Sequence, residues 1–216
     1  MNMPSFLSSL SSTPYALVFA GQATPWREGL DEVAHDPEIA ALLGRVLAAS
    51  DDLLSPVRRE LATQSVASLP FSLPAAAGEP AVARRVNGPD EAALSVPGIV
   101  LSQLGALMDL SRAGVDFASH PPVAFEGHSQ GVLGAAATDS DPVRLYALAR
   151  LLGAATARQT LRAGALPVGE ATPMLALLGV DPAKLSLPEN VTVGIVNTAT
   201  DVVVVGLPPD LAALAI

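Results

Sequence analysis

The sequence has no cysteine and a single lysine, Lys184. A chain without cysteine forms no disulfide and has no thiolate metal site or cysteine nucleophile. Charged residues make up only 15% of the 216 residues, and the net charge at pH 7 is −9. This balance argues against nucleic acid as a partner, because the few cations cannot neutralise a phosphate backbone. Half of the residues are hydrophobic, which favours a sizeable core over disorder.

Targeting and cofactor signals are also missing. The first 13 residues are rich in serine but have no basic start, and the apolar run 15–20 is too short for a signal sequence. No uninterrupted apolar run reaches membrane-spanning length. We therefore expect a cytoplasmic protein with no membrane contact. The sequence has neither a metal-ligand cluster nor a glycine-rich nucleotide loop, so we expect no metal and no bound cofactor.

The most informative segment is 127–131, which reads Gly-His-Ser-Gln-Gly. It follows the apolar run 122–125 and precedes the small and aliphatic residues 132–137. A strand, Gly-x-Ser-x-Gly and a helix together are typical of a nucleophile elbow, which exposes its serine on a tight turn. A Cβ at Gly127 or Gly131 would crowd the strand against the helix. The pattern predicts Ser129 as a nucleophile, with the Gln130 amide directed at a developing negative charge.

The order of the other elements predicts an α/β fold in two parts. We expect a flexible leader at 1–13, an incomplete α/β-hydrolase-like large subdomain at 14–170 and an incomplete ferredoxin-like small subdomain at 171–216. Residues 62–93, rich in Ala, Pro and Gly, suggest a surface excursion. The expected elements of the large subdomain are strands at 16–20 and 122–126 and helices at 37–61, 96–113 and 142–163, with Pro97 in a first turn.

The small subdomain is expected to follow a β-α-β-β-α order, which is the ferredoxin-like order without its last strand. Valine-rich runs predict two of its strands, and Asp181-Pro182 predicts a short helix. The expected strands are 174–180, 191–197 and 201–206, and a further helix starts at Pro209. The sequence then ends within this last element, so we expect the chain to be a fragment, truncated at its C-terminal end.

Four segments together resemble the acyltransferase domain of type I fatty acid synthases, in particular the N-terminal acetyltransferase of bacterial and fungal fused synthases. Their order and spacing cover nearly all of the chain after residue 14. The glutamine after the serine in Gly-His-Ser-Gln-Gly is typical of the acetyltransferase branch. The segments are Phe19-Ala20-Gly21-Gln22, Ser95-Val96-Pro97-Gly98 through Gln103, Gly127-His128-Ser129-Gln130-Gly131-Val132, and Val196-Asn197 through Val205-Gly206.

The resemblance implies a ping-pong reaction. Ser129 would take an acetyl group from coenzyme A and pass it to the phosphopantetheine thiol of an acyl carrier protein, with the other synthase domains as partners. Acetyl-CoA and phosphopantetheine are thus substrates. The backbone amides of Gln130 and Gln22 would form the oxyanion hole. The family usually has glycine after this glutamine, where the present chain has Ala23.

The resemblance also places His128, Leu152 and Asn197 in the substrate site. In malonyl-loading relatives, an arginine at the position of Leu152 pairs with the malonyl carboxylate. A leucine cannot form this pair, and burying the unpaired charge would be costly, which favours acetyl. The alternative is that Leu152 is a core residue and that Arg150 or Arg158 pairs with a carboxylate.

Acyl transfer from serine needs a general base, which is normally histidine. The sequence has His35, His120 and His128, and none of them follows Ser129. The expected base is therefore not in this chain, and activity of the fragment alone is doubtful. Three other readings stay open: a non-catalytic scaffold piece of a synthase, a malonyl- or palmitoyl-type transacylase, and an esterase that uses the same serine. A hydrolase would need an acid and then a histidine after the serine.

Overall fold

The computed structural model describes residues 7, 9–10, 12–21, 25–62, 89–138, 140–162 and 174–214. The chain divides into two compact units, Met1–Gln159 and Thr160–Ile216, and each is described by itself. Most of the predicted leader and excursion, and residue 164 after the predicted helix, lie outside the described residues.

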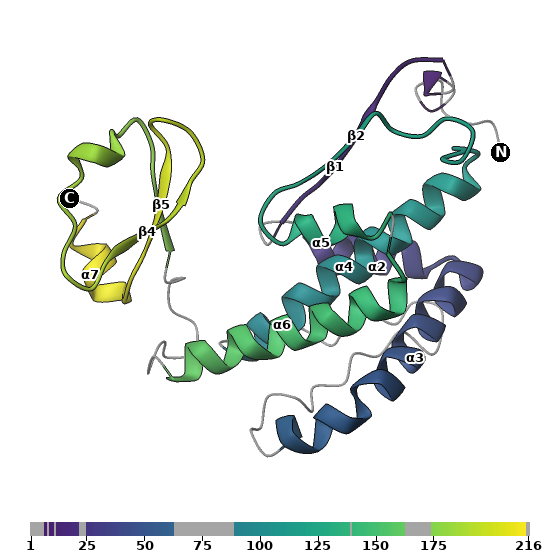
Figure 1. Cartoon of the computed structure of the whole chain (residues 1–216), viewed down its shortest axis with the longest axis horizontal. Helices are drawn as coiled ribbons and strands as arrows, with labels where there is room; N and C mark the ends of the chain where they lie inside the picture. Colours follow the sequence, from purple (N-terminus) through teal and green to yellow (C-terminus); the bar gives the residue numbers. More distant parts are fainter. Residues whose placement is uncertain are drawn as a thin grey trace. The chain divides into compact units, whose positions relative to one another are not determined.

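Four long or well-packed helices build the core of the first unit (Figure 1). They are α2 (Trp26–Ala34), α3 (Pro37–Ala62), α4 (Pro89–Arg112) and α6 (Pro142–Arg162). Their buried side chains form one apolar cluster. The removal of this apolar surface from water stabilises the folded unit. The fully buried members of this cluster include Leu30, Ile39, Leu43, Val100, Leu101, Tyr146 and Ala149.

Asp-Pro pairs begin three helices of the chain. At the start of α3, the Asp36 carboxylate accepts hydrogen bonds from the amides of Glu38 (2.9 Å) and Ile39 (3.2 Å). At the start of α6, the Asp141 carboxylate accepts one from the Val143 amide at 2.9 Å. An aspartate N-cap followed by proline in the first turn is a favourable helix start, because proline needs no acceptor there. The third pair is Asp181-Pro182, which opens the 3₁₀ helix η1 (Pro182–Lys184) of the second unit.

Helix α4 begins earlier than the sequence analysis predicts, so the prediction of a start at residue 96 is wrong. Pro89 supplies the first-turn proline instead, followed by the acidic residue Asp90. Pro97 lies inside the helix and has no N–H to donate to the Ala93 carbonyl. Gly153 of α6 packs on this point, since a Cβ there would lie 2.5 Å from the Ala93 oxygen. The close helix crossing thus covers the backbone group that the proline leaves unbonded.

Part of α4, Ala93–Arg112, is long and apolar enough to cross a membrane by length and composition, and the described residues contain one such helix. Of its most apolar window, 61% is buried inside the protein. The same composition is expected of a central core helix, and in this unit α4 packs against α2, α3 and α5.

Helix α2 is absent from the sequence predictions. Its buried residues Trp26, Leu30 and Ala34 recur at four-residue spacing, which is a helical pattern that could have revealed it. Trp26 lies directly on Gly98 of α4, where a Cβ would come within 2.3 Å of the indole ring. A Cβ on Gly29 would likewise lie 2.8 Å from the Ser102 hydroxyl oxygen. Small residues therefore allow α2 to approach α4 closely.

A two-stranded parallel sheet lies beside this helical core (Figure 1). Strand β1 (Ala16–Phe19) pairs with β2 (Ala124–Gly127), and Ala16 is opposite Ala124. The short helix α5 (Gly131–Ala136) follows β2 and packs on both strands and on α4. Phe19 is buried under the sheet, whereas Val18 on the opposite face is 68% exposed. Because the strands are parallel, their carboxyl ends, which lead to residues 20 and 128, lie at the same end of the sheet.

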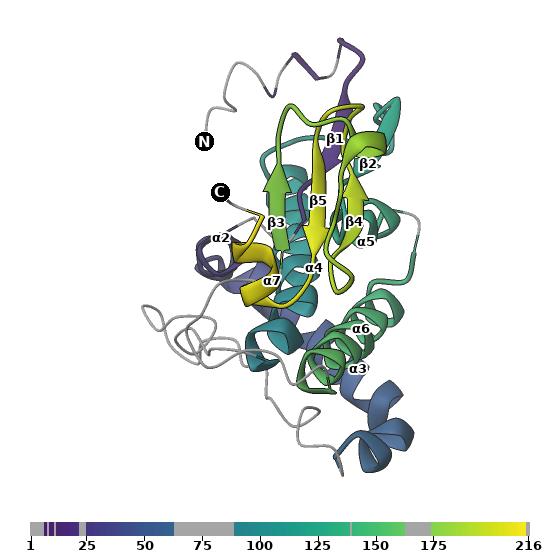
Figure 2. The ribbon, with the colours of Figure 1, turned by 90° about the vertical axis from the view of Figure 1, so that its left-hand side faces the viewer.

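The second unit contains a three-stranded antiparallel sheet in the order β3-β5-β4 (Figure 2). Its strands are β3 (Met174–Leu177), β4 (Thr192–Val196) and β5 (Val202–Val205), and η1 lies between β3 and β4. Helix α7 (Pro208–Ala212) follows and buries Leu211 against Val202 and Val204. A β-bulge interrupts the β4–β5 pairing between Val193 and Ile195. The order β-η-β-β-α matches the predicted element order, with a single 3₁₀ turn in place of the first helix.

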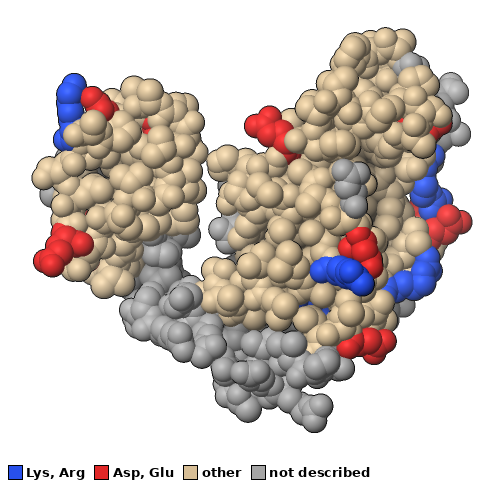
Figure 3. All heavy atoms as spheres, viewed as in Figure 1, with Lys and Arg blue, Asp and Glu red and all other residues tan. Residues whose placement is uncertain are grey.

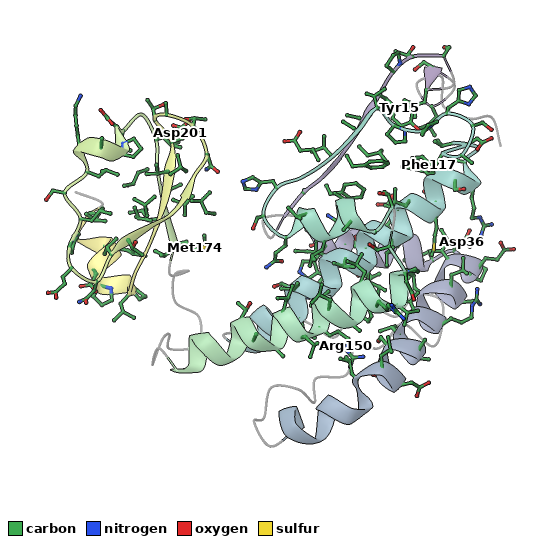
Figure 4. All side chains as sticks on the ribbon, in the orientation of Figure 1. Tyr15, Asp36, Phe117, Arg150, Met174 and Asp201 are labelled. Atoms are coloured by element: carbon green, nitrogen blue, oxygen red, sulfur yellow. The ribbon has the colours of Figure 1, made fainter. Side chains whose placement is uncertain are left out.

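One ion pair ties α6 to α3 in the first unit. The Arg150 guanidinium donates to the Asp51 carboxylate at 2.6 Å and to the Ser50 hydroxyl at 3.0 Å. Figure 4 shows Arg150 on the side of α6 that faces α3. The Arg150 side chain is 15% exposed, and Ser50 is fully buried. Tyr146 lies one turn earlier on α6, and burial raises the pKa of its hydroxyl above the usual range.

We predict that Arg150→Met lowers the free energy of unfolding by about 1–3 kcal/mol, because a charged hydrogen-bond donor is lost at a partly buried site. Urea unfolding measures the effect. Arg144→Met on the same helix is the matched control, since Arg144 is 81% exposed and its distance to the Asp141 carboxylate is 3.7 Å. The control should change stability by less than about 0.5 kcal/mol. Equal losses in both variants would show that the α3–α6 tie does not stabilise the unit.

Candidate functional site

Ser129 lies in the turn between β2 and α5. Its φ is 54°, and it is the one non-glycine residue with positive φ among the described residues. This left-handed conformation costs free energy for a residue with a Cβ, and it persists where the surrounding structure enforces it. The Ser129 side chain is exposed. A serine that is strained, exposed and placed between strand and helix has the backbone geometry of a nucleophile.

Two glycines make this tight turn possible. A Cβ on Gly127 would lie 2.3 Å from the Gly131 carbonyl and from the Val132 nitrogen, and one on Gly131 would lie 2.0 Å from the Phe19 oxygen. Both distances are far below van der Waals contact, and both involve backbone that cannot move aside. The sequence argument that a side chain at either position crowds the strand against the helix is confirmed.

The amides that follow Gln130 are hydrogen-bonded within the turn. Gly131, Val132 and Leu133 donate to the carbonyls of residues 128, 129 and 130 at 2.8, 3.3 and 3.0 Å. Gln130 caps α5, and its amide has no acceptor within the part of the chain that the structure describes. An amide in this position can donate to an oxygen attached to Ser129.

The loop after β1 lies against the same turn. A Cβ on Gly21 would be 2.7 Å from the His128 oxygen, 3.1 Å from the Ser129 Cβ and 3.5 Å from the Gln130 nitrogen. The His128 amide donates to the Phe19 carbonyl at 3.2 Å, which extends the strand pairing up to the serine. Gln22, the predicted second oxyanion-hole residue, comes next in the chain and lies outside the described residues.

Gln103 of α4 connects this loop to the helices, a role that the sequence analysis does not assign. Its side-chain Nε2 donates to the Ala20 carbonyl at 2.7 Å. Its Oε1 is buried without a hydrogen-bond partner among the described residues, and a Cβ on Gly134 of α5 would lie 2.1 Å from it. A glutamine within the largely apolar stretch 96–108 of α4 is the sequence signal that could have pointed to this contact.

The three predicted substrate residues lie on different elements of the chain. His128 is exposed and directly precedes Ser129. Leu152 is 42% exposed on α6 and shares a helix face with Leu148, which is 45% exposed. Asn197 belongs to the second unit, where its amide donates to the Asp201 carbonyl at 2.8 Å in the β4–β5 turn. Asn197 and Ser129 belong to different units, and each unit is described by itself.

The other two histidines have local structural roles. The His35 ring hydrogen-bonds to the Asp31 carbonyl of its own helix. The His120 carbonyl accepts from the Tyr15 hydroxyl at 2.7 Å, close to where β1 begins. Burial and the Asp116 carboxylate raise the pKa of Tyr15 there. Ser129 follows the opposite, carboxyl end of the parallel pair, so His120 is not positioned to take its proton.

One of the two arginines proposed to pair with a substrate carboxylate is bound within the core. Arg150, one of the two alternative carboxylate partners, is held by Asp51 and Ser50 on α3. The side chain of Arg158, the other, lies outside the described residues. In Figure 3, charges of both signs are scattered and most of the visible surface is uncharged. No group of His, Asp or Glu suited to a metal ion occurs among the residues searched, which are the described ones.

Comparison with known proteins gives one family. The sequence profile of the family described as "starter unit:ACP transacylase in aflatoxin biosynthesis" matches residues 17–168, which is more than two thirds of the chain. The matched range includes all of β1 except Ala16, helices α2, α3, α4 and α6, and the Ser129 turn. A search of curated proteins finds no match.

We predict that Gly131→Ala destabilises the first unit by about 3 kcal/mol, because the new methyl group meets the Phe19 backbone oxygen. Gly134→Ala is the matched control on the same helix, where the atoms nearest to the new methyl group belong to the side chains of Gln103 and Phe19 and not to the backbone. Gly134→Ala should lower the free energy of unfolding by clearly less than Gly131→Ala does. Thermal unfolding of both variants tests the order, and the opposite order would contradict the account of the turn.

Proposed function

Because the chain belongs to the family of starter unit:ACP transacylases of aflatoxin biosynthesis, we propose that Ser129 carries an acyl starter unit from coenzyme A to an acyl carrier protein. The family membership supports acyl transfer to a carrier protein within a multidomain synthase. The observation that carries the choice of residue is the positive φ of Ser129 in a turn closed by Gly127 and Gly131. We propose that this turn is a nucleophile elbow in an α/β-hydrolase-like unit.

The proposed reaction has two half-reactions. The Ser129 hydroxyl attacks the thioester carbonyl, and coenzyme A leaves as its thiol. The phosphopantetheine thiol of the carrier protein then attacks the acyl-serine ester and releases Ser129. In both tetrahedral intermediates the oxyanion accepts hydrogen bonds from the amides of Gln130 and Gln22. The position of Gly21 beside the Gln130 nitrogen supports this pairing, because Gln22 is the next residue. In the first half-reaction the proton of the Ser129 hydroxyl ends on the sulfur of coenzyme A. None of the described histidines is proposed as the base that carries it.

The proposed acyl group is uncharged, with acetyl as the first choice. The resemblance puts Leu152 where malonyl-loading relatives have arginine, and the exposed Leu148 and Leu152 offer an apolar surface. Arg150, the described alternative partner for a carboxylate, is already paired with Asp51. A malonyl carboxylate near these leucines would lose hydration without gaining a cation.

The synthase that receives the starter unit is proposed to be of the fatty acid or polyketide type. The sequence resemblance favours acetyl priming of a fatty acid synthase, whereas the family description is of a polyketide pathway. The acyl preference separates the two. Acetyl preference supports priming of fatty acid synthesis, and preference for a longer acyl chain supports a polyketide starter unit.

We predict that acetyl-CoA acylates Ser129 and that Ser129→Ala abolishes this labelling. Intact-protein mass spectrometry and peptide mapping measure the modification. Ser140→Ala, at an exposed serine in the same unit, is the matched control and should keep full labelling. If the unmodified chain takes up no acyl group from acetyl-CoA, malonyl-CoA or a medium-chain acyl-CoA, the chain is a non-catalytic part of a synthase and the proposal is wrong.

We also predict that malonyl-CoA labels the chain at least 10-fold more slowly than acetyl-CoA, and that Leu152→Arg narrows this ratio. An arginine can form the bidentate pair that leucine cannot. Leu53→Arg, at a leucine of α3 that is 49% exposed, is the control for the added charge. Equal labelling by both substrates in the unchanged chain would overturn the assignment of Leu152.

A further inference from the structure

We propose that Gln103 is a positioning residue, which holds the chain at Ala20 and Gly21 against the Ser129 turn and so sets where the next residue, Gln22, begins. This inference rests on the proposed function, because it concerns the two amides assigned to the oxyanion hole. It concerns a side chain that touches neither Ser129 nor, in the proposed reaction, the acyl group.

The hydrogen bond of Gln103 lies at the point where β1 ends. Its Nε2 donates to the Ala20 carbonyl at 2.7 Å, across 83 residues of sequence. Ala20 is the first residue after β1, so strand pairing with β2 does not fix its carbonyl. The next residue, Gly21, lies against the Ser129 Cβ and the Gln130 nitrogen. The bond therefore holds the first peptide of the loop that faces the serine.

The other end of the same amide packs on α5. The Gln103 Oε1 is buried, and it lies so close to Gly134 that a Cβ on this glycine would be 2.1 Å away. Phe19 fills the neighbouring space, at 2.7 Å from the same Cβ position. The Gln103 side chain thus hydrogen-bonds to Ala20, two residues before Gln22, and contacts α5, the helix that Gln130 caps.

The anchor of this side chain is rigid. Gln103 lies on α4 between Leu101 and Leu104, and both leucines are buried in the core cluster. Since the core holds this part of α4, the Gln103 side chain has few alternative rotamers. The position of the chain after β1 therefore depends on the packing of the core. Oxyanion-hole donors are effective only when they are already in place, and misplacement by about 1 Å costs about 100-fold in rate.

The test compares two substitutions at Gln103. Gln103→Leu keeps the approximate shape and removes the donor, and Gln103→Glu keeps the shape and places an acceptor against the Ala20 carbonyl. In single-turnover acylation with acetyl-CoA, we expect both to lower the maximal rate by roughly 10-fold to 100-fold. The acetyl-CoA concentration at half-maximal rate should change less than about 3-fold, because no group that contacts the substrate is removed.

The control for charge is Ala106→Glu, on an exposed position about one turn from Gln103. It should leave the maximal rate unchanged. Gly134→Ala provides an independent disturbance, because its methyl group displaces the Gln103 amide from the other side. This substitution should lower the maximal rate although residue 103 is still glutamine.

The readout separates positioning from folding. A purely structural role would reduce the fraction of chain that reacts, whereas the proposed role slows the rate of the fraction that does react. Normal rates with a reduced amplitude, or normal rates in both Gln103 variants, would overturn the assignment. If the unmodified chain is not acylated at all, the proposed function fails instead, so the two failures are distinguishable.

Discussion

The close approach of α5 to the end of β1 is the constraint on which the rest of the site depends. Gly131 lies against the Phe19 carbonyl with no room for a Cβ, and Gly127 lies against the first peptide of α5. Between them the chain must reverse from strand to helix within three residues. Ser129 takes up the reversal with its positive φ, and its side chain is left exposed. The position of the serine and of the neighbouring amide thus follows from backbone packing and not from side-chain bonds.

A two-stranded sheet is marginal by itself, so the helical core has to hold this site in place. Helix α4 does most of this, because it contacts α2, α3 and α5, and its Gln103 bonds to the chain directly after β1. Two irregular positions of α4, Pro97 and Gly98, are covered by residues of the neighbouring helices. Gly153 of α6 covers the carbonyl that Pro97 leaves unbonded, and Trp26 of α2 lies on Gly98. The Ser129 turn is therefore held in position by its packing against the helical core.

Much of this arrangement could be predicted from the sequence where the signal is local. The Gly-His-Ser-Gln-Gly motif indicated its flanking strand and helix and the need for both glycines, and Asp181-Pro182 indicated the start of a short helix. The start of α4 could not be placed, because Pro97 looks like a first-turn proline until Gly153 is seen packing on it. A polar contact of Gln103 could have been expected, but not its partner, since Ala20 is distant in sequence. Arg150 was a candidate for a substrate carboxylate, and only packing shows that Asp51 holds it. Whether Leu152, His128 and Asn197 contact a substrate stays a prediction.

The most direct test of the account is a crystal structure of the chain after Ser129 has reacted with a phosphonate that mimics the tetrahedral intermediate. The account predicts a phosphonyl group on the Ser129 Oγ, with one oxygen about 2.7–3.1 Å from the amide nitrogens of both Gln130 and Gln22. A serine that stays unmodified, or an adduct whose oxygen binds neither amide, would contradict the assignment of this turn as an acyl-transfer site.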